Sequence, residues 1–111
     1  MKTIQVGTEF HKRLTNRDER QRDGTYTAVE FREKFLGILD DEALWKTDNP
    51  EITLDFKDVE KMGPSWTNEV FAYFTKYADP SRILKKIVII NISRVKMAII
   101  EQELNAGYSR K

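Results

Sequence analysis

The sequence predicts a small α/β domain, because strand-like and helix-like segments alternate along its 111 residues. Residues 52–56 have the alternation of a strand, and residues 87–90 have the continuous apolar character of a buried strand. Each of these segments is followed by a serine that could cap a helix and then by apolar residues at helical spacing. Such alternation favours parallel strands joined by right-handed crossovers. We therefore expect a mostly parallel or mixed sheet of about four strands with about three helices.

The first half of the chain predicts one strand and one helix. Residues 3–6 have the alternation of a short strand. Residues 7–25 show no apolar period, which indicates a long polar loop or an irregular hairpin. Thr27 and Glu30 have the spacing of a capping box, and apolar residues follow at helical spacing, so we expect a helix over about 28–40.

The segment from residue 52 onward predicts a strand, a turn and a helix. Residues 52–56 alternate between apolar and polar side chains, which is typical of a strand with one buried face. Gly63 and Pro64 break the chain, and Ser65 then stands where its oxygen can accept the free N–H groups of a new helix. Aromatic residues form one face of this second helix, which should end before Asp79.

The last strand and helix follow from residues 87–105. Residues 87–90 are apolar at consecutive positions, which predicts a strand buried on both faces or central in the sheet. Ser93 is expected to cap the last helix, which should end at residues 105–107 and leave 105–111 as a loose tail. The apolar side of that helix is predicted to hold Val95, Ala98, Ile99 and Gln102.

Composition limits the classes of protein that the chain can represent. Hydrophobic residues make up 40% and charged residues 33% of the sequence, which fits a single domain spanning residues 1–111 with a well-solvated surface. The sequence has no apolar run of about eighteen residues and no signal-peptide core, so we expect a cytoplasmic protein without a membrane partner. The absence of cysteine excludes disulfides and thiolate zinc sites.

Charge is unevenly distributed along the chain. Residues 40–60 carry eight acids against two lysines. Residues 10–22 carry two acids against five basic residues, which are Lys12, Arg13, Arg17, Arg20 and Arg22. These segments are either solvated loops that partly neutralise each other or a pair of recognition surfaces.

Several motifs resemble the bacterial STAS-like domain family of unknown function, over roughly residues 3–104. They are Arg-Asp-Gly at 22–24, Glu-Phe-Arg-Glu-Lys-Phe-Leu at 30–36, Ile-Thr-Leu-Asp-Phe-Lys-Asp-Val at 52–59, Gly-Pro-Ser-Trp at 63–66 and Glu-Val-Phe at 69–71. The resemblance implies a small STAS-like domain that is a non-catalytic interaction module and works with a protein partner such as an ATPase or kinase-like protein.

A more distant similarity connects residues 52–66 to the anti-sigma factor antagonists. In those proteins a partner kinase phosphorylates a serine at the head of the corresponding helix. Here Pro64 occupies that position, Gly63 replaces the usual aspartate, and Ser65 follows one residue late.

The start of the second helix is therefore the candidate site. Ser65 is interpreted either as a helix cap or as a hydroxyl that accepts a phosphoryl group or contacts a partner. We expect the partner surface to include Asp58 on the preceding turn and Glu69 one turn further on. Trp66 would be an interface anchor if it points outward and a core residue if it points inward.

Two other functions remain open. Residues 12–22 form a basic loop that could bind nucleic acid with help from Arg94, Lys96, Arg110 and Lys111, although a net charge of +1 gives this little support. A small enzyme would place its site at the strand ends, near Asp55 and Asn91.

The sequence favours no enzyme class. Asp55 and Asp58 resemble a catalytic acid pair but fit a solvated strand end better, and the Arg-Asp-Gly at 22–24 fits a turn better than a phosphate site. His11 is the only histidine, and the common catalytic motifs are missing. We therefore expect no catalysis, no cofactor and no metal. A homodimer through an exposed sheet edge stays open.

Overall fold

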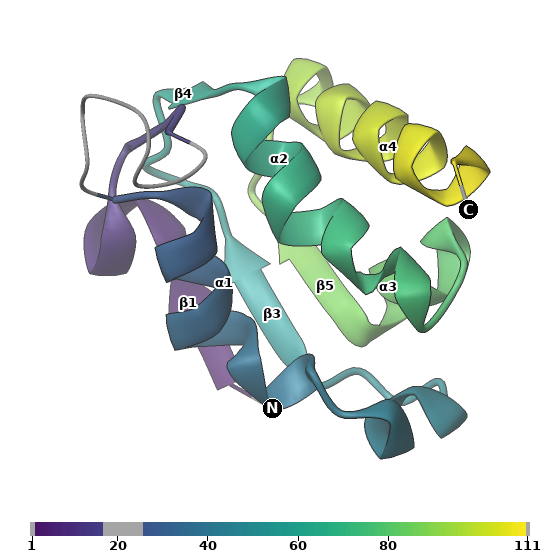
Figure 1. The fold of residues 1–111 in the computed structure, drawn as a ribbon. Helices are drawn as coiled ribbons and strands as arrows, with labels where there is room; N and C mark the ends of the chain where they lie inside the picture. The colour runs from purple at the N-terminus through teal and green to yellow at the C-terminus, as the bar shows by residue number, and fades with distance from the viewer. Residues whose placement is uncertain (1, 17–25, 111) are drawn as a thin grey trace.

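Three parallel strands form the main sheet of the computed structural model, which describes residues 2–16 and 26–110. They are β1 (Lys2–Gln5), β3 (Ile52–Asp55) and β5 (Ile87–Ile90), in the order β1-β3-β5 (Figure 1). Two short parallel strands, β2 (Arg13–Leu14) and β4 (Lys61–Met62), form a second sheet. The predicted α/β class and parallel pairing are confirmed, but the strands divide into sheets of three and two instead of one sheet of about four.

The described residues hold four α-helices, one more than predicted. They are α1 (Ala28–Leu36), α2 (Pro64–Phe71), α3 (Pro80–Lys86) and α4 (Arg94–Ser109). Shorter helical segments are the π-helical turn η1 (Val6–Phe10) and the 3-10 segments η2 (Gly37–Leu39), η3 (Glu42–Lys46) and η4 (Ala72–Lys76). None of the helices in the described ranges has the length and apolar character that crossing a membrane requires.

The core lies between the sheet and the helices in front of it. Figure 1 shows α1 and α2 across one face of the sheet, with α4 beyond α2. Ile4 on β1 and Leu54 on β3 are paired neighbours in the sheet, and both are fully buried. Phe31 of α1 and Trp66 of α2, also fully buried, have ring centroids 5.1 Å apart.

The prediction that residues 87–90 form a strand buried on both faces or central in the sheet was wrong. β5 lies at an edge of the main sheet, and its burial decreases along the strand until Ile90 is exposed. β3 is the central strand, and all four of its residues are buried, including Thr53 and Asp55. The polar residues of β3 gave it the pattern of a half-buried strand, but Thr53 and Asp55 are buried as well.

Residues 7–16 are more ordered than the predicted loop or hairpin. The turn η1 buries Val6 and Phe10, and Leu14 on β2 is fully buried. β2 pairs in parallel with β4, which a hairpin cannot produce. The apolar residues of this segment are isolated and follow no helical or strand period, so the sequence pattern did not predict its structure.

Two predictions about α4 were wrong. The helix continues through Gly107 to Ser109, so residues 105–109 are not a loose tail. A Cβ atom on Gly107 would lie 2.6 Å from the Cβ of Ala72, so this glycine permits close packing and does not end the helix. The buried residues are Ile100 and Leu104, whereas Val95, on the predicted apolar side, is 73% exposed.

The caps explain where several helices begin. The Thr27 side chain accepts a hydrogen bond from the Glu30 N–H at 3.1 Å, as the capping box predicts. The Ser93 hydroxyl accepts one from the Lys96 N–H at 3.2 Å, also as predicted. α3 was not predicted, although Asp79 caps it and Pro80 occupies its first position.

Candidate functional site

The α2 helix begins without a side-chain cap. Gly63 is the N-cap residue and Pro64 occupies the first helical position, where its fixed φ and missing N–H are tolerated. The prediction that Ser65 caps the helix was therefore wrong, because Ser65 already lies inside the first turn. The Gly63 carbonyl accepts hydrogen bonds from the N–H and the hydroxyl of Thr67, at 3.1 and 2.8 Å.

Ser65 is half-buried, and within the described residues its hydroxyl has no hydrogen-bond partner. The uncapped N–H groups around it carry the positive end of the helix dipole. This environment would favour a negative charge on the Ser65 side chain.

Trp66 is a core residue and not an interface anchor. Its side chain is fully buried between α1 and α2, in contact with Phe31. Of the two placements that the sequence left open, the structure has the inward one.

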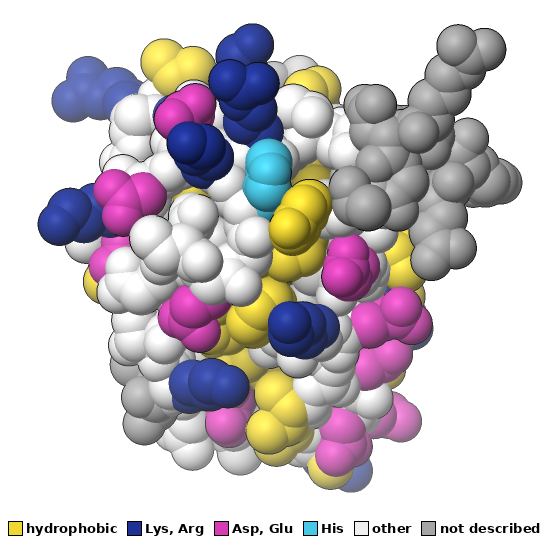
Figure 2. Space-filling model, turned by 90° about the vertical axis from the view of Figure 1, so that its left-hand side faces the viewer, with side chains coloured by type: hydrophobic (Ala, Val, Ile, Leu, Met, Phe, Trp, Pro, Cys, Tyr) yellow, Lys and Arg dark blue, Asp and Glu magenta, His cyan; other side chains and the backbone are white. Residues whose placement is uncertain are grey.

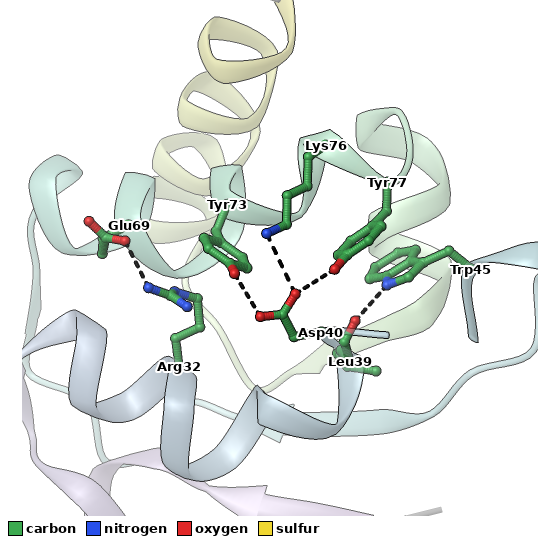
Figure 3. Close-up of polar contacts among 8 residues, drawn as sticks. All are labelled: Arg32, Leu39, Asp40, Trp45, Glu69, Tyr73, Lys76 and Tyr77. Atoms are coloured by element: carbon green, nitrogen blue, oxygen red, sulfur yellow. Dashed lines mark hydrogen bonds and ion pairs between the residues drawn. The ribbon is translucent and has the colours of Figure 1, made fainter. Parts of the chain in front are cut away.

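Glu69 is engaged inside the fold. Its carboxylate pairs with the Arg32 guanidinium of α1 at 3.1 Å, and the two side chains are 21% and 12% exposed (Figure 3). The guanidinium also lies 3.7 Å from the centroid of the Tyr73 ring. Glu69 therefore holds α1 against α2.

Asp58 is exposed on the turn between β3 and β4. Gly7 packs against this turn, because a Cβ atom there would lie 2.6 Å from the Asp58 carbonyl carbon. A shallow depression of about 680 Å³ borders Asp58 and is also lined by His11, Lys12 and Lys57. Asp58 is exposed, and its place in a partner surface stays a prediction.

The two residues of the predicted strand-end site do meet. The amide of Asn91 donates to the Asp55 carboxylate at 3.1 Å, and the backbone N–H of Lys57 donates to it at 2.9 Å. The hydrogen bond from Lys57 lowers the pKa of Asp55; burial opposes this effect and the Asn91 amide adds to it. Asn91 has a positive φ of 53°. A buried, ionised and hydrogen-bonded carboxylate is suited to joining β3 to β5 rather than to moving protons.

The described part of the basic loop is partly neutralised by one acid. Lys12 and Arg13 each lie 3.7 Å from the Glu60 carboxylate. The backbone N–H of Arg13 donates to Nδ1 of His11, whose ring packs on Tyr26. Figure 2 shows Lys and Arg side chains interspersed with Asp and Glu on this face. The other predicted members of the loop, Arg17, Arg20 and Arg22, lie outside the described residues.

A cluster of polar side chains around the Asp40 carboxylate was missed by sequence reasoning. Asp40 accepts hydrogen bonds from the hydroxyls of Tyr73 and Tyr77 and lies 3.5 Å from Nζ of Lys76 (Figure 3). These tyrosine hydrogen bonds, followed by the lysine charge, lower the pKa of Asp40, and Asp40 in turn raises the pKa of Tyr77. The spacing of Tyr73 and Tyr77, four residues apart, was the available signal.

Trp45 supports the same region. Its indole N–H donates to the Leu39 carbonyl at 2.7 Å, and its ring stacks on Tyr77. Trp45 lies in η3, inside the acid-rich segment 40–60.

Comparison with known proteins supplies one match. The model of a family described as a STAS-like domain of unknown function matches residues 27–97. No curated protein matches, and no solved structure does. Over the described ranges, no group of three or more acidic or histidine side chains is placed to hold a metal ion.

Proposed function

This chain belongs to the family of STAS-like domains of unknown function, and from that membership we propose that it is a non-catalytic regulatory module acting through protein–protein contact. The proposed switch is Ser65 at the start of α2. Asp58, which is exposed on the preceding turn, is the second residue of the proposed contact surface. The proposed partner is an ATPase or kinase-like protein, which would phosphorylate Ser65.

The observation that carries the proposal is the uncapped first turn of α2. Gly63 offers no side-chain oxygen to the N–H groups of that turn, and the Ser65 hydroxyl is left without a hydrogen bond among the described residues. A phosphate on Ser65 would add about two negative charges at the positive end of the helix. The dipole would stabilise the modified side chain while the charge changed the surface that a partner meets.

Trp66 and Glu69 do not belong to the proposed contact surface. Trp66 is buried, and Glu69 is paired with Arg32. Their role is to hold α2 in place, so that Ser65 is presented on a fixed helix. The contact surface is therefore narrower than the sequence suggested.

The other two functions receive less support. Ion pairs with Glu60 reduce the charge that Lys12 and Arg13 could offer to a phosphate backbone. The Asp55 carboxylate accepts a hydrogen bond from the Asn91 amide, and its pKa is lowered. It is therefore ionised at neutral pH, which does not suit a general acid.

The proposal is tested by affinity capture from a lysate of the native host, with this chain as bait. Captures with and without Mg²⁺ and ATP are compared by mass spectrometry of the bound proteins and of the bait. We expect an ATPase or kinase-like protein in the capture and phosphate on Ser65 after ATP is added. An unmodified Ser65 and a capture of nucleic acid alone would reject the proposal.

A further inference from the structure

The α4 helix presents an apolar side chain to solvent at its first turn. Ile100 and Leu104 face the core, so Val95 lies on another side of the helix. At 73%, Val95 is the most exposed of the large hydrophobic side chains in the described ranges. Nothing else in the described chain covers it.

Two basic residues flank this valine. Arg94 and Lys96 are its neighbours in the sequence, and neither has an ion-pair partner among the described residues. The first turn of α4 is therefore an apolar knob with positive charge on both sides, which we call the α4 knob (Arg94, Val95 and Lys96).

A groove of opposite charge lies between α3 and α4. Figure 1 shows these helices side by side near the C-terminus, and the space between them has a volume of about 450 Å³. Leu84, Leu104 and Tyr108 provide its apolar lining. Asp79 and Glu101 supply the charge at its rim, and no basic residue of the described chain lines it.

Both acids are available as negative charges. The backbone N–H of Arg82 donates to the Asp79 carboxylate at 2.9 Å and lowers the pKa of Asp79, so the carboxylate is ionised at neutral pH. Glu101 is exposed, and no ion pair within the described chain neutralises it.

We propose that the chain forms a homodimer in which the α4 knob of each copy sits in the α3–α4 groove of the other. Val95 would cover the apolar lining, and Arg94 and Lys96 would face Asp79 and Glu101. In a two-fold dimer the same contact would be made twice, which closes the assembly.

A second copy fits this groove because the chain itself carries a turn of matching chemistry. Opposite charges on the two surfaces favour the encounter and set its register, and the buried valine contributes apolar area. The contact is small compared with a standard interface of about 1,600 Å², so we expect a dissociation constant in the range of about 1–100 μM. The proposal does not use Ser65 or the start of α2 and can fail independently of the proposed function.

Sedimentation velocity of the full chain, from about 1 to 500 μM, tests the dimer. The sedimentation coefficient should rise with concentration, and added salt should weaken the association, because exposed charge pairs are screened. Glu101→Lys and Arg94→Glu should each weaken the dimer by about tenfold or more, and the combined variant should recover to within about threefold of the wild type.

Glu33→Lys is the matched control, because it makes the same change of charge on an exposed position of α1. Circular dichroism of every variant confirms that the fold is kept. The proposal is wrong if the wild-type chain stays monomeric over the whole range, if Glu33→Lys weakens a dimer as much as Glu101→Lys does, or if the combined variant does not recover.

Discussion

Arg32 is held by two different contacts in the interface between α1 and α2. Its guanidinium pairs with Glu69 and stacks over the ring of Tyr73. Both charged partners are largely removed from water, so each would be costly to leave alone. Arg32 belongs to the motif at 30–36 and Glu69 to the motif at 69–71. Their pairing gives the two motifs a structural role.

Replacement of Arg32 by alanine should therefore destabilise the protein. We expect Arg32→Ala to lower the free energy of unfolding by about 2 kcal/mol or more, because Glu69 would lose its partner. Urea unfolding measures this change. Glu33→Ala, at an exposed position of the same helix, should change the stability by less than about 0.5 kcal/mol. Equal effects of the two variants would show that the ion pair contributes no stability.

Asp40 should make stability depend on pH. A carboxyl whose folded pKa is lowered stabilises the protein above its unfolded pKa, and that contribution is lost as the pH falls through the folded value. Asp40→Asn should therefore be less stable than the wild type at pH 7, and the difference should shrink below about pH 4. Urea unfolding at both pH values measures the difference. A difference that does not change with pH would contradict the assigned role of the Asp40 charge.

At the scale of secondary-structure elements, α4 and η4 approach each other through small residues. A side chain on Gly107 would collide with Ala72, so the close contact of the two segments depends on that glycine. Gly37, by contrast, has helical φ and ψ, and a Cβ atom there would meet nothing within 4 Å.

The two glycines therefore predict opposite effects of the same substitution. Gly107→Ala should lower stability by about 1–3 kcal/mol despite the better helix propensity of alanine, because the added methyl group overpacks the contact. Gly37→Ala should raise stability by about 0.5–1 kcal/mol, through the lower entropy of the unfolded chain. Thermal and urea unfolding compare the two. A stabilised Gly107→Ala variant would mean that the helices move apart easily.

The serines at the starts of α2 and α4 provide a second pair of positions at which the same substitution should have different effects. Ser93 caps α4, so Ser93→Ala should cost about 1 kcal/mol. Ser65 does not cap α2, so Ser65→Ala should change the free energy of unfolding by less than about 0.5 kcal/mol. Equal losses in the two variants would restore the capping role to Ser65 and weaken its assignment as a switch.

At the scale of the whole molecule, sequence patterns predicted the positions of helices and strands along the chain better than the order of the strands in the sheet. Thr27 and Ser93 marked helix starts correctly, because capping is a local interaction. The position of β3 between β1 and β5 depends on pairing between distant segments, and the consecutive apolar residues of β5 pointed to the wrong central strand.

The residues of the candidate site also divide into those that local sequence chemistry identifies and those whose placement depends on distant segments. Asp58 and Ser65 could be selected from the sequence, since turn and helix-start chemistry is local. The burial of Trp66 and the pairing of Glu69 depend on α1, which lies more than thirty residues earlier in the chain. The Asp40 cluster joins the end of η2 to η4 and Tyr77 over a similar separation, and no local pattern around Asp40 predicted it.

The central claim is that the start of α2 controls the binding of a protein partner, and it is tested most directly by comparing two variants as baits in host lysate. Ser65→Asp places a negative charge at the proposed switch, and Ser109→Asp places the same charge at the exposed end of α4. Quantitative mass spectrometry gives the ratio of each captured protein between the two baits. We expect an ATPase or kinase-like protein that Ser109→Asp retains and Ser65→Asp loses by about tenfold or more. Equal capture by the two baits would contradict the claim.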